Sequence, residues 1–316
     1  MSLGTGQGEM KVQPVNCSRA MHRAYPHVRI IGAVNATAFG LGPLPGTDLA
    51  QAADVVRSES PLPHIPQLPE RGVGSDAIGR TAALLDIPIA LGPRGWRVAA
   101  RKRADADRMA RDLDVLEEAW HGKADAVKVQ LVGPFTLAAE VEMPNGHRMI
   151  TDDGALRDLT DALLEACDEH RRDVASRFGS TVLQLDEPLL PEVTAGTLKG
   201  TTDYETIRAI PEPQETLQRF GEHLLHTPQL LDDTPWLTVD PRTCDRDALA
   251  RLLDKGSRIA IPTMAPRELY RVFDELQIDP ARTTIDVYAE PAATLVDTAA
   301  NYRAAREMAE ELSAEL

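Results

Sequence analysis

Apolar runs of six or seven residues alternate with charged, amphipathic stretches along most of the chain. VKVQLVG (127–133), TVLQLD (181–186) and SRIAIPT (257–263) have the composition of buried strands. The longest amphipathic stretch, residues 155–179, ends at a glycine, as helices commonly do. Apolar strands that are separated by helices predict a parallel sheet covered by helices.

The same patterns place the other elements. We expect further strands at 28–39, 86–92, 235–240 and 283–290, and further helices at 48–59, 75–85, 103–122, 134–142, 215–225, 244–256, 267–276 and 293–315. Residues 40–48 and the proline-rich 60–74 are expected to be irregular, the second at the surface. Over this length the alternation favours an α/β fold of the (β/α)8 TIM-like barrel type, with a doubly wound open sheet as the alternative.

One strand of this barrel is expected to be reduced or missing. The chain between Pro188 and Trp236 is short for a complete strand and helix, which points to the sixth strand. We expect residues 1–27 to be a flexible N-terminal segment, because they lack an apolar core, and residues 28–316 to form a single barrel domain.

Charge and cysteine content restrict the class of protein. The 34 basic and 49 acidic residues leave a formal net charge of −15, which disfavours nucleic acid and anionic membranes as partners. No apolar run approaches the roughly 18–20 residues of a membrane span, and the N-terminus does not resemble a signal peptide. The three cysteines are far apart, so we expect a cytoplasmic protein without disulfides.

In a barrel of this type functional residues lie where strands end. Carboxylates are frequent at these positions in this sequence: Asp186 and Glu187 follow one strand, and Asp240 and Glu290 end two others. Small and polar residues follow the remaining strands, at 40–42, 133–136 and 263. These strand ends are the candidate site.

Four segments resemble the catalytic barrel of the cobalamin-independent methionine synthases, in a short single-domain, actinobacterial-like form. LQLDEPLL (183–190) is similar to the family's Gln-x-Asp-Glu-Pro strand end, and VKVQLVGPFTLAAE (127–140) to its Val-Lys-x-x-x-x-Gly-Pro-x-Thr segment. FGLGPLPGT (39–47) and residues 63–85 resemble the N-terminal loop and the helix after it. The resemblance covers residues 30–190 better than the remainder.

This resemblance implies a function and a substrate site. The family transfers a methyl group from a methylated folate to the thiol of homocysteine, with zinc holding the thiol as a thiolate. The expected partners are therefore a homocysteine-like thiol and a folate-like donor. By position, the substrate-binding residues would be Gln184, Asp186, Glu187, Gly42, Gly133 and Thr136.

The zinc ligands of the family are where the sequence departs from the pattern. His226 falls at the histidine position, but Pro228 replaces the cysteine that should follow it, and Glu290 stands at the position of the second cysteine. With Asp240, these side chains leave an oxygen-rich candidate set, His226, Asp240 and Glu290, which would suit magnesium or manganese better than a thiolate-activating zinc. The alternative is that these are a solvated histidine and two rim carboxylates.

Two functions therefore remain open at the level of sequence. The chain is either a methionine-synthase-like methyltransferase or a degenerate member that binds a small ligand or a protein partner without catalysis. A decarboxylase of the uroporphyrinogen type is a third reading, disfavoured because residues 35–50 contain no arginine. Away from the site, Cys167 is expected to be buried, and the charged residues Asp105, Asp107, Arg108, Arg111 and Asp112 are expected to form a solvated helix face.

Overall fold

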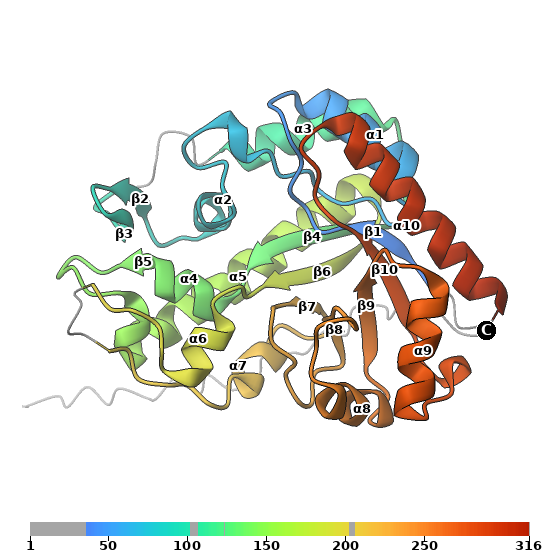
Figure 1. Ribbon diagram of the computed structural model, residues 1–316. Coiled ribbons are helices and arrows are strands. Elements are labelled where there is room, and N and C mark those ends of the chain that lie inside the picture. The colour runs from blue at the N-terminus through green and yellow to red at the C-terminus, as the bar shows by residue number, and fades with distance from the viewer. Residues whose placement is uncertain (1–35, 102–106, 123, 202–205, 316) are drawn as a thin grey trace, which may run out of the picture. The chain divides into compact units, whose positions relative to one another are not determined.

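The computed structural model describes residues 36–101, 107–122, 124–201 and 206–315 (Figure 1). The described residues belong to one compact unit, Ala33–Leu316. The expected flexible segment 1–27 and most of the strand expected at 28–39 lie outside the described residues.

Seven strands, all parallel, form the main sheet, which confirms the expected fold class at this level. Their order is β1 (Ala38–Gly40), β10 (Ile285–Ala289), β9 (Arg258–Pro262), β8 (Trp236–Thr238), β7 (Leu224–His226), β6 (Ser180–Asp186) and β4 (Ala126–Val132). Neighbours in this order mostly follow one another along the chain, as right-handed strand–helix–strand units require.

Helices connect and cover these strands (Figure 1). They are α1 (Leu49–Glu59), α2 (Ala77–Leu84), α3 (Arg108–Trp120), α4 (Pro134–Glu140), α5 (Asp153–Phe178), α6 (Leu190–Ala195), α7 (Gln214–Gln218), α8 (Arg246–Asp254), α9 (Pro266–Leu276) and α10 (Leu295–Glu315), with short 3-10 turns at Pro69–Arg71, Met149–Thr151 and Pro280–Arg282. Among the helices described, none combines the length and the apolar content of a membrane span.

The strands place alternate side chains on two faces. On β6, Leu183 and Leu185 belong to the large core between sheet and helices, which also buries Cys167, as expected. A second, smaller core lies on the other face. It joins side chains from all seven strands: Phe39, Leu224, Trp236 and Ala260, with Ala126, Val182 and Tyr288 packed against them, together with Leu41 and Leu62.

The sheet curls around this second core. Phe39 of β1 meets Trp236 of β8 edge-to-face, with ring centroids 6.2 Å apart, although two strands separate β1 from β8. The ammonium of Lys128, on the opposite edge strand β4, lies 5.3 Å from the centre of the Phe39 ring. Side chains of the two edge strands therefore meet inside the curl.

A proline-rich segment runs between these edge strands, so the expectation that 60–74 is surface chain is wrong for residues 62–68, all of which are buried. The amide of Leu62 donates to the carbonyl of Ala38 (3.2 Å), and the amide of Ile65 donates to that of Lys128 (3.1 Å). Proline has no N–H to donate, so the segment makes isolated bridges rather than a continuous ladder. Its apolar side chains nevertheless complete both cores.

Two further expectations need correction. Residues 215–225 are not one helix: α7 ends at Gln218, Gly221 turns the chain with φ +70°, and Leu224–His226 forms β7. The expected gap before Trp236 thus holds a short strand. The strand expected at 86–92 exists as β2 (Ile89–Gly92), but it belongs to a separate small sheet with β3 (Gly95–Val98) and β5 (Val141–Glu142).

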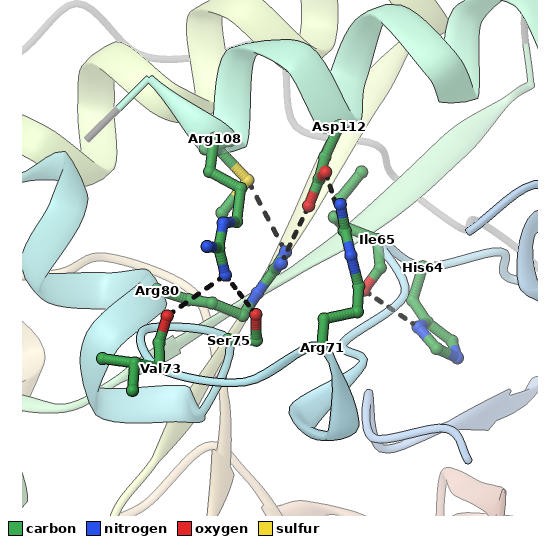
Figure 2. Close-up of polar contacts among 9 residues, drawn as sticks. His64, Ile65, Arg71, Val73, Ser75, Arg80, Arg108 and Asp112 are labelled. Atoms are coloured by element: carbon green, nitrogen blue, oxygen red, sulfur yellow. Dashed lines mark hydrogen bonds and ion pairs between the residues drawn. The ribbon is translucent and has the colours of Figure 1, made fainter. Parts of the chain in front are cut away.

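The charged face of α3 is not fully solvated as expected, because Asp112 is only 2% exposed. Its carboxylate forms salt bridges with Arg71 (2.8 Å) and with the buried Arg80 on α2 (3.2 Å), as Figure 2 shows. Beside it, Arg108 donates to the carbonyl of Val73 and to the Ser75 hydroxyl. Asp107 and Arg111 are exposed as expected, whereas Asp105 lies outside the described residues. The sequence pattern of α3 predicts an amphipathic helix, but it does not show that α2 packs against the charged side of that helix.

Candidate functional site

A pocket of about 590 Å³ opens at the carboxyl ends of the central strands. His226 at the end of β7, Thr238 and Asp240 at the end of β8, and Tyr288 on β10 contribute to its wall. Pro188, residues 227–230, Thr243, Cys244 and the start of α8 complete the lining. The pocket lies where ligands bind in barrels and open parallel sheets alike.

Asp186 stands next to this pocket as the last residue of β6. It pairs in register with His226 and precedes Pro188 by two residues, and both of these line the pocket. Gln184 Nε2 donates to Asp186 Oδ1 (2.7 Å), but no basic residue within the described ranges forms a salt bridge with this carboxylate. Burial raises the pKa of Asp186 to about 7, against the opposing effects of Gln184 and Lys128.

Gln184 links Asp186 to a buried lysine. Lys128 Nζ donates to Gln184 Oε1, and Gln184 Nε2 also donates to the carbonyl of Leu41 (2.8 Å). Lys128 and Gln184 are both fully buried. The β4–β6 register pairs Gln130 with Gln184, so strand alternation places Lys128, Gln184 and Asp186 on the same inner face. Burial lowers the pKa of Lys128 to about 7, while the negative charge of Asp186 raises it.

The network continues from Lys128 to the C-terminal helix. The side-chain amide of Gln130 is oriented so that its oxygen faces two donors. Gln130 Oε1 accepts from Lys128 Nζ (3.2 Å) and from His64 Nδ1 (3.1 Å). His64 Nε2 then accepts from the hydroxyl of Tyr302 on α10, 2.8 Å away. Burial, and secondarily Lys128, lowers the pKa of His64 to about 3, so this imidazole is neutral at physiological pH.

Gly40 allows Tyr302 to reach this network. A Cβ at position 40 would lie 2.1 Å from the Tyr302 hydroxyl oxygen, far inside van der Waals contact. Glycine therefore fits at the end of β1 because the tyrosine crosses the backbone at this point.

Glu187 faces away from this network and holds the start of α4. Its carboxylate accepts hydrogen bonds from the amides of Phe135 (2.9 Å) and Thr136 (2.7 Å) and from the Thr136 hydroxyl (2.6 Å). A Cβ on Gly133 would lie 2.3 Å from a Glu187 oxygen, so glycine permits this approach. Three of the predicted substrate residues, Gly133, Thr136 and Glu187, thus form a junction between β6 and α4 in which their polar groups bind one another.

Glu187→Gln should lower the free energy of unfolding by about 2–3 kcal/mol, because one carboxylate oxygen becomes an NH₂ that faces the N–H donors of α4. Urea denaturation measures this loss. Glu192→Gln, on the exposed side of α6, is the matched control and should change stability by less than about 0.5 kcal/mol. Equal stabilities of the two variants would contradict the capping role of Glu187.

Gly42, the remaining predicted substrate residue, lies at the inner rim with φ +128°. A Cβ at this position would lie 3.1 Å from Gln67 Oε1 and 3.4 Å from the Gln130 side chain. It therefore adjoins the buried network rather than the pocket wall.

The predicted metal set does not assemble. His226 Nδ1 is 3.0 Å from the Thr238 hydroxyl, and burial lowers the pKa of His226 to about 4. Asp240 accepts three hydrogen bonds from Arg242, whose charge and hydrogen bonds hold the pKa of Asp240 below its usual range, and Glu290 is exposed. Within the described part of the chain, no group of three or more His, Cys, Asp or Glu side chains is placed to hold a metal ion.

The donor chemistry also does not fit the zinc centre of the methionine synthases. That centre needs thiolates. Cys167 is instead buried in the large core between sheet and helices, and burial raises the pKa of Cys244, the cysteine that lines the pocket. Among the residues that the structure describes, the pocket thus offers a neutral imidazole and an aspartate engaged by Arg242, but no thiolate pair.

Sequence comparison adds a partial relation. No known family profile matches the chain. A segment of 154 residues is 27% identical to isocyanide synthase A of Aspergillus fumigatus, over 47% of this chain and 23% of that protein. The chain thus spans less than a quarter of that relative's length, and the similarity does not assign it to a family.

Proposed function

We propose that this chain is a closed eight-stranded barrel, related to the methionine synthases, that binds a small amino acid at the carboxyl end of its strands. The contact between Lys128 and Phe39 supports closure, because it joins side chains of the two edge strands of the sheet. The segment 62–67 supplies the eighth position, since it hydrogen bonds to β1 on one side and β4 on the other.

The observation that carries the ligand assignment is the carboxylate of Asp186. It lies beside a pocket, it is held in place by Gln184, and no described cation forms a salt bridge with it. Asp186 is half-buried, and carboxylates that are largely removed from water are usually paired. A ligand ammonium group at Asp186 would complete the pair, with the remainder of the ligand in the pocket.

The pocket wall suits an amino acid with a short apolar or sulfur-containing side chain. Leu230, Val239 and Tyr288 supply apolar surface, and the neutral imidazole of His226 can exchange a hydrogen bond with a thiol. Binding and orientation of such a ligand need only these side chains. Zinc-assisted methyl transfer to its thiol has no donor set among them, so we assign ligand binding and derive no step through a metal.

Isothermal titration calorimetry with the full chain tests this function. L-Methionine and L-homocysteine should bind saturably, and 4-(methylthio)butanoic acid, which is methionine without its amino group, should bind at least about 100-fold more weakly. Equal binding of methionine and its desamino analogue would overturn the assignment, as would the absence of binding by both amino acids. Stoichiometric zinc that survives dialysis would favour the methyltransferase instead.

A further inference from the structure

A buried chain of hydrogen bonds ties Lys128 to the proposed ligand site. Lys128 Nζ donates to Gln184 Oε1, and Gln184 Nε2 donates to Asp186 Oδ1 at 2.7 Å. The lysine and the carboxylate are thus separated by a single amide on one face of adjacent strands. At this separation in a low-dielectric interior, a charge on either group is strongly felt by the other.

Asp186 is the counter-charge of Lys128 among the acidic groups described around it. The next acid inside the curl, Asp286 on β10, is held by Arg258 on β9 through bonds of 2.6 and 2.8 Å. Glu187 is engaged by the amides of α4.

The remaining titratable neighbours of Lys128 carry no charge at neutral pH. His64 lies on the segment between the edge strands, and His226 lies on β7. Burial and the proximity of Lys128 depress the pKa of both imidazoles, to about 3 and about 4. Tyr302, on α10, meets His64 rather than the lysine, and burial raises its pKa well above its usual range. A change in the charge balance at Asp186 therefore shifts the pKa of Lys128, and no other charged neighbour compensates for it.

The surroundings of Lys128 also accept a neutral amine. Its two acceptors are Gln184 Oε1 and Gln130 Oε1, and an NH₂ group has two hydrogens to donate to them. Losing the third proton breaks neither of these bonds. The aromatic face of Phe39, which favours a cation, is the contact that the neutral form would weaken.

We propose that ligand binding at this site is linked to a proton: when a ligand ammonium occupies Asp186, Lys128 releases its ammonium proton to solvent. This inference rests on the proposed function. In the free protein Lys128–NH₃⁺ balances Asp186–COO⁻. In the complex R–NH₃⁺ balances Asp186–COO⁻, Lys128 becomes –NH₂, and one H⁺ passes to the buffer, so charge and atoms balance.

The sign of the pH dependence follows from this exchange. A binding step that releases a proton strengthens as pH rises, by at most tenfold per pH unit for one proton. The pKa of about 7 for Lys128 places this window around neutrality. Above it Lys128 is already neutral in the free protein, so the proton release disappears.

Two measurements test the inference, the first without ligand. With lysine labelled by ¹³C at Cε, the Lys128 signal, assigned by its loss in Lys128→Met, should titrate near neutral pH in the wild type. In Asp186→Asn the midpoint should fall by about one unit or more, because the counter-charge is gone. A Lys128 signal that does not titrate between pH 6 and 8.5, or an unchanged midpoint in Asp186→Asn, would overturn the inference.

The second measurement is calorimetry of L-methionine binding at pH 7 in phosphate and in Tris, whose ionisation enthalpies differ. The wild type should release close to one proton, and the ¹³Cε signal of Lys128 should move to the position of a neutral amine when L-methionine is bound. Binding of L-methionine without proton release would contradict this inference but leave the proposed function intact. If neither L-methionine nor L-homocysteine binds, the proposed function fails, and the ligand-linked release fails with it.

Discussion

Asp186→Asn should weaken the binding of L-methionine by about 100-fold or more, measured by calorimetry at pH 7.5. Asparagine keeps the shape of the side chain and still accepts from Gln184 Nε2, but it lacks the charge that a ligand ammonium needs. Removing one partner of a buried charged hydrogen bond typically costs about 2–5 kcal/mol, and 100-fold corresponds to about 2.7 kcal/mol. The effect on stability should be small at this pH, because Asp186 is linked to Lys128 only through Gln184 and Lys128 of the variant, whose pKa falls below about 7, is then neutral.

Asp240→Asn is the matched control for this variant. Asp240 lines the same pocket just after β8, two strands away from β6, yet its carboxylate is already satisfied by Arg242. Its affinity for L-methionine should stay within about threefold of the wild type, since partly exposed pairs contribute little. Similar losses in the two variants would mean that overall negative potential attracts the ligand, and a larger loss in Asp240→Asn would move the amine site to β8.

Asp112→Asn is expected to produce the largest loss of stability, about 3–5 kcal/mol by urea denaturation. The carboxylate is buried and binds two guanidinium groups, of which Arg80 is itself buried (Figure 2). Burial lowers the pKa of Arg80 and the charge of Asp112 opposes that change, so the variant leaves a buried cation without its partner. Asparagine is close in volume, so cavity formation does not contribute.

Asp114→Asn, two residues further along α3, separates charge burial from helix effects. Its carboxylate is 68% exposed and pairs with Arg177 at the surface, so its loss should cost less than about 1 kcal/mol. A small effect of Asp112→Asn, comparable with that of Asp114→Asn, would show that the buried cluster contributes little to the stability of the fold.

The parallel sheet was predictable because its longest strands carry their own signal. The sequences of β4, β6 and β9 are nearly continuous apolar runs, which are typical of strands buried on both faces. Gly179 ends α5 and so marks the boundary before β6. The segment 62–68 was missed because proline suggests loops, whereas here it permits an extended chain that pairs only at isolated positions. β7 was missed because three residues give no periodicity to count.

The residues of the site that lie at strand ends could be predicted from the sequence. The contacts between distant strands and helices inside the curled sheet could not. The position of Asp186 at the end of β6 follows from the sequence alone. Its neighbour Glu187 has the same local signature, and only packing shows that it caps α4. Lys128 had one usable signal, a charge at an inner position of an apolar strand. His64 and Tyr302 lie 238 residues apart and have none.

A crystal structure of the full chain with L-methionine tests whether Asp186 holds the ligand ammonium. The ligand nitrogen should lie within hydrogen-bonding distance of the Asp186 carboxylate, with the ligand side chain in the pocket lined by His226 and Tyr288. A ligand whose nitrogen lies elsewhere, with Asp186 bonded only to Gln184, would contradict this assignment.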